Sequence, residues 1–306
     1  MANKIIESVV INNKGRVRGN NEDNFFLNGI YLQRKEMDEG AFISNSSEDL
    51  FQLYAVCDGM GGADSGEEAS YCAVHELSLG YQELNKKLQP DELTDVLYNI
   101  SEKIRQEALQ RGQKSGTTIA MAVVDDGRLC LANVGDSRVY RLRNNSLQQM
   151  SVDHSKIQRM MSMGLITPEQ ARTDPSRHVI TQYLGMPSDI KIAPYISQPS
   201  ELRENDIYLL CSDGLTDMVE DKQIEAVLAS KADLKEAAQT LMKAAMQNGG
   251  RDNTTIMLLR VKKVADKTEV PGKNNTGLQT VLTAAQAIVG GGILLTIADF
   301  VYYILH

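Results

Sequence analysis

The stretch LYAVCDGMGG, residues 53–62, joins a run of apolar residues to an acidic residue and a glycine-rich turn. The aromatic and β-branched residues of the run favour a buried strand, and the glycines allow a tight turn or a close approach of backbone to a ligand. Asp58 stands at the junction, where a rigid strand would hold its carboxylate in place. The stretch therefore predicts a core strand that ends in a polar site.

Similar apolar runs recur along the chain. Runs of strand length occupy residues 118–124, 129–134, 138–142, 207–211 and 255–261. Two long helical patterns, from about residue 65 to 84 and from Pro90 to about 108, separate the first run from the others. A second helix pair, 221–228 and 234–247, precedes the last run. Strands grouped with helix pairs, without regular alternation, favour an α+β fold with mostly antiparallel sheets.

Composition narrows the class of protein. The chain has 306 residues, enough for one sizeable domain with an appendage. A net charge of -8 and the absence of a basic run argue against nucleic-acid binding. None of the cysteines forms a CxxC pair, so we expect buried thiols in a reducing cytoplasm and no zinc site. The cysteines are Cys57, Cys72, Cys130 and Cys211. The N-terminus lacks the layout of a signal peptide, which predicts a cytoplasmic domain.

Four aspartates share one context at the ends of predicted core strands. They are Asp58, Asp136, Asp213 and Asp252. Any one of them is explained by turn chemistry, since Asp-Gly is a common turn sequence. Their joint occurrence, together with Glu22 and Asp23 before an early strand, predicts a cluster of carboxylates.

Such a cluster calls for hard divalent cations, because the carboxylates would otherwise repel one another. Oxygen ligands favour Mn²⁺ or Mg²⁺ over Zn²⁺. Two such ions can activate one water molecule, which suits the hydrolysis of a phosphate ester without a protein nucleophile. Arg18, four residues before Glu22, offers a guanidinium for the phosphate.

Short motifs follow one another in a fixed order across residues 14–261. They are RGNNED (18–23), DGMGG (58–62) with Gly66 and AS (69–70) after it, SGTT (115–118), GDSR (135–138), DHS (153–155), SDGL (212–215) and DNTT (252–255). In this order they resemble the motifs of the metal-dependent protein phosphatase family (type 2C), in its bacterial branch.

The resemblance implies a four-layer αββα sandwich, in which helix pairs flank two antiparallel sheets and the metals lie at one end. It implies hydrolysis of phosphoserine and phosphothreonine in proteins, opposing a bacterial Ser/Thr kinase. Two alternatives stay open at this point. One is a catalytically weak regulatory module of the same fold. The other is a phosphatase of another phosphoester, or a stress-response regulator that dephosphorylates anti-sigma antagonists.

The resemblance also implies a role for each site residue. Asp58, Asp213 and Asp252 would hold a first metal, Asp58 and the Gly59 carbonyl a second, and Asp136 with Asp213 a weaker third. Glu22 and Asp23 would support the metals through water, and Arg18 would hold the substrate phosphate. Animal members have a histidine, proposed as the leaving-group acid, where this chain has Met60. The acid is therefore unassigned.

For two further segments and three histidines, the sequence supports only general structural predictions. Residues 160–177 resemble the mobile flap of bacterial members. The polar stretch 31–50 is expected to form a solvated loop. His75, His154 and His178 are expected to be structural histidines, in the core or capping turns.

The sequence predicts three parts of the chain. They are a catalytic domain of residues 1–262, a linker of residues 263–277 and a hydrophobic helix of residues 278–306. The linker contains Pro-Gly and is rich in Asn, and no charged residue occurs from residue 274 to 298. That length suits a helix that anchors the protein in the cell membrane, and the lysines before it suit a cytoplasmic flank. A helix docked on a partner or on the membrane surface, and a disordered tail, are the alternatives.

Overall fold

Two antiparallel sheets form the centre of the computed structural model, which describes residues 4–61, 65–81, 90–230 and 233–263. The first sheet has the order β3 (Ala41–Ser47), β1 (Lys4–Asn13), β13 (Thr254–Lys263), β12 (Ile207–Cys211), β8 (Arg138–Arg143) and β9 (Ser146–Gln149). The second has the order β10 (Tyr195–Ile196), β7 (Arg128–Val134), β6 (Ile119–Asp125), β4 (Phe51–Gly61) and β2 (Asp23–Leu27). In addition, β11 (Ser200–Glu201) pairs with β7 and β5 (Ser115–Thr117) pairs with β4.

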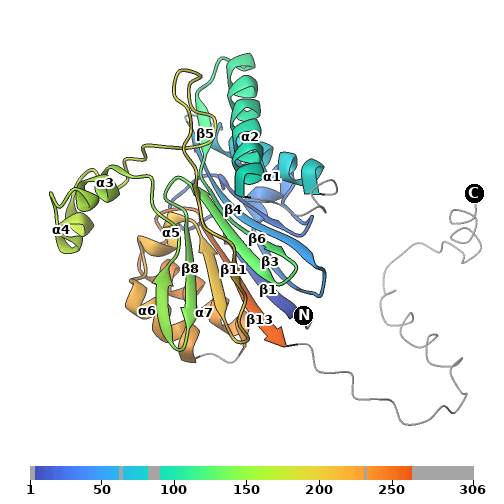
Figure 1. The fold of residues 1–306 in the computed structure, drawn as a ribbon. Coiled ribbons are helices and arrows are strands. Elements are labelled where there is room, and N and C mark those ends of the chain that lie inside the picture. Colours follow the sequence, from blue (N-terminus) through green and yellow to red (C-terminus); the bar gives the residue numbers. More distant parts are fainter. Residues whose placement is uncertain (1–3, 62–64, 82–89, 231–232, 264–306) are drawn as a thin grey trace, which may run out of the picture. The chain divides into compact units, whose positions relative to one another are not determined.

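Helices cover the outer face of each sheet (Figure 1). The pair α1 (Gly66–Tyr81) and α2 (Pro90–Gln110) packs on the sheet that contains β4. The pair α6 (Asp221–Ser230) and α7 (Leu234–Gln247) packs on the sheet that contains β13. The shorter helices are η1 (Arg34–Glu39), α3 (Lys156–Ser162), α4 (Pro168–Thr173) and α5 (Asp213–Thr216). The four-layer α+β sandwich is therefore the fold that the motifs implied.

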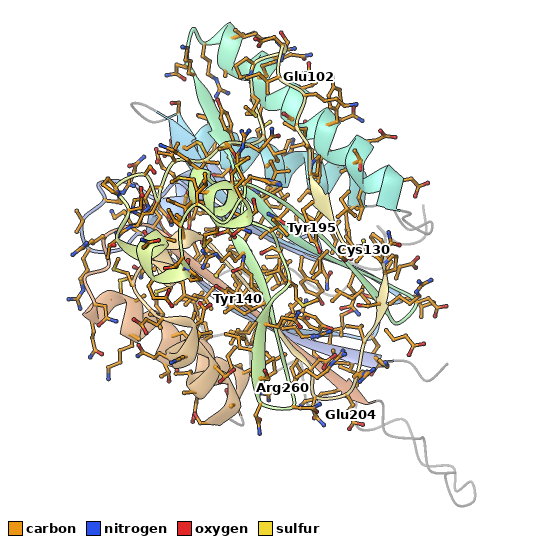
Figure 2. All side chains as sticks on the ribbon, turned by 60° about the vertical axis from the view of Figure 1, so that its left-hand side comes forward. Glu102, Cys130, Tyr140, Tyr195, Glu204 and Arg260 are labelled. Atoms are coloured by element: carbon orange, nitrogen blue, oxygen red, sulfur yellow. The ribbon has the colours of Figure 1, made fainter. Side chains whose placement is uncertain are left out.

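Apolar side chains fill the three spaces between these four layers. One core lies between the two sheets, where Phe25, Tyr54 and Met257 are fully buried. The second lies between β4 and its helices, and the third between β13 and its helices. Figure 2 labels Cys130 of the second core and Tyr140 of the third on the strands that carry them. All four cysteines are buried free thiols, as predicted.

The predicted strands and long helices are confirmed to within a few residues. The expectation for residues 31–50 was wrong, because this stretch contains η1 and β3. Along β3 every second residue is exposed, and the strand pairs with β1 at the edge of the sheet. Polar residues on the exposed side of an edge strand resemble loop sequence, which explains the error. The long strand β1 was also missed.

The C-terminal predictions lie almost wholly outside the described residues. Strand β13 continues to Lys263, one residue into the predicted linker. The rest of the linker and the predicted hydrophobic helix 278–306 are not described. Among the helices of the described residues, none combines the length and the apolar character that crossing a membrane requires.

Candidate metal centre

The predicted site residues meet at one end of the sandwich. They line a cleft of about 450 Å³ whose walls include Arg18, Glu22, Asp58, Gly59, Asp136, Asp213 and Asp252. The chain reaches this cleft from β4, from the turn between β7 and β8, from the first residue of α5 and from the residues before β13. Strand ends from both sheets thus bring together residues that are far apart in the sequence.

Asp23 differs from the others because it is fully buried beneath the cleft. It pairs with Asp58 across β2 and β4. Its Oδ2 accepts hydrogen bonds from the hydroxyls of Ser212 and Thr255, each at 2.7 Å. Its Oδ1 is buried without a hydrogen-bond partner among the described residues. A buried, unpartnered carboxylate oxygen is costly unless something cationic or a water molecule satisfies it.

The electrostatics of the cluster suit a bound positive charge. Burial, and then the neighbouring aspartates, raise the pKa of Asp58 and of Asp213 well above the usual value. Burial raises the pKa of Asp23 to about 7 and that of Asp136 to about 6. Burial also raises the pKa of Glu22, which Arg18 partly offsets. Carboxylates that raise one another's pKa in this way form a site that a divalent cation would stabilise.

Arg18 extends over the rim of the cleft. Its Nη2 lies 2.7 Å from Asp252 Oδ2, and about half of its side chain is exposed. Hydrogen bonding to Asp252 raises the pKa of Arg18 despite partial burial. The guanidinium is therefore charged, and part of it remains accessible to an anion.

Polar side chains from the motifs hold the acidic residues in place. Asn253 accepts a hydrogen bond from the Glu22 backbone and donates to the carbonyls of Lys14 and Asn20. Thr118 accepts from the Asp58 backbone and shares a 2.6 Å hydrogen bond with Ser137. The motifs DNTT, SGTT and GDSR thus build the frame of the cleft as well as its lining.

Two of the histidines are structural, as expected. The backbone N–H of Gly135 donates to His154 Nδ1, so His154 caps the turn that carries Asp136. Burial lowers the pKa of His154, which keeps the ring neutral. His75 hydrogen-bonds to the Tyr31 hydroxyl and stacks on Tyr71.

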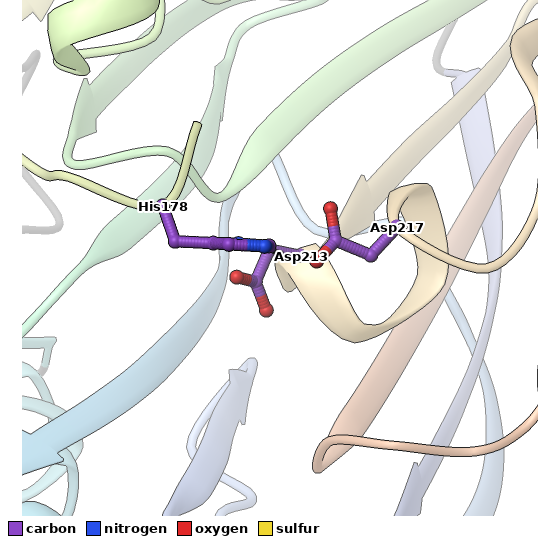
Figure 3. A group of neighbouring side chains, drawn as sticks. All are labelled: His178, Asp213 and Asp217. Atoms are coloured by element: carbon purple, nitrogen blue, oxygen red, sulfur yellow. Dashed lines mark ion pairs between the residues drawn. The ribbon is translucent and has the colours of Figure 1, made fainter. Parts of the chain in front are cut away.

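His178 does not follow that expectation. It lines the cleft, and its Nδ1 lies 3.3 Å from Asp217 Oδ2, one turn of helix beyond Asp213 (Figure 3). The ligand atoms of His178, Asp213 and Asp217 lie within 4.8 Å of one another. The segment after α4 thus contacts the acidic site directly. Neither His178 nor Asp217 was singled out for the site, although Asp217 follows directly on the SDGL motif.

Sequence reasoning also missed the framework residues Ser212, Asn253 and Thr255 as individual contributors. Each lies inside a recognised motif, within three residues of a predicted ligand. The available signal was their hydrogen-bonding chemistry at strand ends. Their partners, however, lie in other motifs and only the folded chain identifies them.

A helix-flanked double sheet with a carboxylate-lined cleft at one end defines a class of metal-dependent hydrolase. The family model described as "Protein phosphatase 2C" matches residues 27–159 and 176–254. The chain belongs to this family. The unmatched residues between the two ranges include α4 and the end of α3, inside the segment that resembles a flap.

Relatives agree over most of the chain. The chain is 31% identical over 252 residues to the serine/threonine phosphatase stp of Listeria monocytogenes, covering 80% of this chain and 92% of that protein. It is 30% identical over 220 residues to the protein phosphatase PhpP of Streptococcus pneumoniae, covering 69% and 86%.

A solved structure that contains metal ions shares the fold. It is the catalytic domain of the serine/threonine protein phosphatase PstP in complex with two manganese ions. It is 28% identical, has a TM-score of 0.68, and covers 85% of this chain and all of its own.

Proposed function

We propose that this protein is a metal-dependent protein serine/threonine phosphatase that hydrolyses phosphoserine and phosphothreonine in protein substrates. The observation that carries the proposal is the group of carboxylates around one cleft, which raise one another's pKa and leave Asp23 Oδ1 unpartnered. These residues fit two Mn²⁺ or Mg²⁺ ions. Bound there, the ions would supply an activated water molecule and positive charge for the phosphate.

Each residue has a proposed role. Asp58, Asp213 and Asp252 hold the first ion, and Asp58 with the Gly59 carbonyl holds the second. Asp136, with Asp213, holds a weaker third ion, and Glu22 and Asp23 support the site from its edge and floor. Arg18 binds and orients the substrate phosphate, because it is charged, exposed at the rim and anchored by Asp252.

The test is hydrolysis of p-nitrophenyl phosphate and of a phosphothreonine peptide during titration with Mn²⁺. We expect activity to depend on the metal, to disappear with EDTA, and to fall at least about 100-fold in Asp213→Asn. Full activity of Asp213→Asn would sink the proposed metal site. Hydrolysis of the aryl phosphate without the peptide would argue for another phosphoester as substrate.

A protein phosphatase needs a kinase that makes its substrates, so we infer that a Ser/Thr kinase acts opposite this protein. The proposed setting is the cytoplasm, since all four cysteines are buried free thiols, which is typical of a reducing compartment. Partner identity would be tested by co-purification of a kinase whose phosphorylated form the protein dephosphorylates.

We also propose that the C-terminal segment, residues 278–306, anchors the domain in the cell membrane. Support comes from the uncharged stretch at residues 274–298 and the lysines that precede it. Cell fractionation tests this proposal. Recovery in the membrane fraction that only detergent releases is expected. Release by high salt would indicate a surface-bound helix, and recovery without detergent in the soluble fraction would refute the span.

A further inference from the structure

A second groove begins at the rim of the metal cleft. Its volume is about 520 Å³, and Met60 and Gly61 line both the cleft and this groove. One wall is the C-terminal end of α2, with Ala108 and Leu109, and another includes Tyr183. The two hollows are therefore continuous along the backbone that follows Asp58.

The walls of the groove are largely apolar, and close packing and backbone hydrogen bonds hold them in place. The side chain of Leu109 is 64% exposed, although it lies on a helix whose other apolar residues are mostly buried. The Tyr183 ring packs so closely on Gly116 that a Cβ on this glycine would lie 2.3 Å from the ring. The backbone of Thr117 exchanges two hydrogen bonds with Leu184, which ties this wall to the strand beside the metal cleft.

The charge of the groove comes from Lys114. Two basic side chains line the groove, Arg105 and Lys114. Arg105 forms an ion pair with Glu102 at 2.5 Å, which largely cancels its charge. Lys114 is exposed and forms no ion pair with any residue that the structure describes. An apolar surface with one uncompensated cation suits a ligand with apolar and acidic groups.

We propose that this groove binds the substrate polypeptide next to the phosphorylated residue, and that it selects an apolar side chain accompanied by an acidic one. The inference rests on the proposed phosphatase activity. An extended chain advances about 3.3 Å per residue, so a peptide whose phosphate lies in the cleft reaches the groove within a few residues when it runs over the rim that the two hollows share. Its neighbouring side chains then meet Leu109 and Lys114.

The experiment measures kcat and KM of the full-length protein with Mn²⁺ on a set of phosphothreonine peptides. The peptides have alanine at all flanking positions except for one leucine, placed in turn at each position on either side. A second set adds an aspartate or a lysine beside the preferred leucine. The variants are Leu109→Glu, Lys114→Glu and, as a matched control, Leu79→Glu. Leu79 lies on α1 outside the groove and is 59% exposed.

We expect the wild type to favour leucine at one flanking position about tenfold, through KM. Leu109→Glu should abolish this preference, and Lys114→Glu should change a preference for aspartate into one for lysine. Leu79→Glu should behave as the wild type. All variants should hydrolyse p-nitrophenyl phosphate at the wild-type rate, because this small substrate does not reach the groove.

Other outcomes would overturn the inference. No positional preference in the wild type, or a preference that Leu109→Glu retains, would show that the groove does not bind the flanking residues. Equal losses on the peptides and on the aryl phosphate would show that the substitutions disturb the metal cleft instead. Absence of metal-dependent hydrolysis of either substrate by the wild type would instead contradict the proposed function itself.

Discussion

The buried aspartate at the floor of the cleft shows what a single residue can report about a metal site. Asp23 receives two hydrogen bonds on one oxygen and none on the other from the residues that the structure describes. Its pKa is raised to about 7, first by burial, in the protein without metal. The carboxylate therefore stabilises the fold only when it is protonated or when a cation lies beside it.

The pH dependence of stability follows from that shift. Without metal, the native state holds the Asp23 proton up to about pH 7, whereas the unfolded chain releases it near 3.8. The native state binds more protons in this window, so the free energy of unfolding falls as pH rises. In EDTA we expect a lower urea midpoint at pH 8 than at pH 5, and a smaller difference in Asp23→Asn. Saturating Mn²⁺ should remove the loss at pH 8.

A midpoint in EDTA that does not fall between pH 5 and pH 8, or falls equally in Asp23→Asn, would contradict this account. The comparison with Asp23→Asn is needed because other groups titrate in the same range. His154, whose pKa is lowered by burial, changes stability in the opposite direction.

The proposed contact between Arg18 and the substrate phosphate predicts a loss of activity when the guanidinium is removed. Replacement by alanine removes a bidentate donor for phosphate while leaving the carboxylates intact, so kcat/KM for p-nitrophenyl phosphate should fall about 10- to 100-fold. Arg18→Lys should recover part of this loss, since it retains the charge without the planar fork. Mn²⁺-dependent thermal stabilisation should remain in both variants. An unchanged kcat/KM in Arg18→Ala would exclude the proposed phosphate contact.

Among the secondary-structure elements, the junction of β2, β4 and α1 holds the site together. Gly59 on β4 lies where a Cβ would be 2.1 Å from the Gly66 carbonyl oxygen and 2.6 Å from that of Glu22. The Ser70 hydroxyl on α1 donates to the Glu22 carbonyl at 2.6 Å. This close packing gives the DGMGG motif a structural reason that is separate from metal binding.

Gly59→Ala should therefore destabilise the fold even without metal. We expect a loss of about 1–3 kcal/mol in the free energy of unfolding, measured by urea titration in EDTA. Gly19→Ala is the matched control, since no atom lies within 4 Å of the position of its Cβ. Equal stability of Gly59→Ala and Gly19→Ala would mean that the three elements can move apart at no cost.

The segment that contains α3 and α4 leads directly into a contact with the site. His178 follows this segment and contacts Asp217 on the turn after Asp213 (Figure 3). Asp217 lies at the C-terminal end of the short helix α5. The position of the segment is therefore linked to the helix that carries a proposed metal ligand.

At the scale of the whole molecule, the three cores of the described residues are built from residues 6–261. In the described part of the chain, the last element of the two sheets and helix pairs ends at Lys263. A protein of residues 1–263 should consequently fold and retain kcat for p-nitrophenyl phosphate within about twofold, while losing the membrane association that we propose for the full chain. Thermal unfolding and the aryl phosphate assay check this expectation. A large loss of melting temperature would show that the C-terminal part belongs to the folded domain.

The sequence by itself determined most of the strands, the long helices and the residue types that line the cleft, but not strands β1 and β3. The apolar runs beside Asp58, Asp213 and Asp252 are local patterns in the sequence. Such patterns predict strands and helices because apolar residues recur with the period of the element that buries them. The order of the motifs was enough to identify the family. The edge strand β3 was not predicted because none of its side chains is fully buried, so its polar sequence does not differ from that of a loop.

Only the tertiary structure decided which of these residues lie beside one another. It placed Asp23 beneath the cleft, bonded to Ser212 and Thr255 from the other sheet. It also brought His178 to Asp217 and joined the apolar groove at Leu109 to the rim at Met60. The physical reason is that local patterns record whether a side chain is buried. The choice of neighbour depends on strand register and layer packing between segments that the sequence holds far apart.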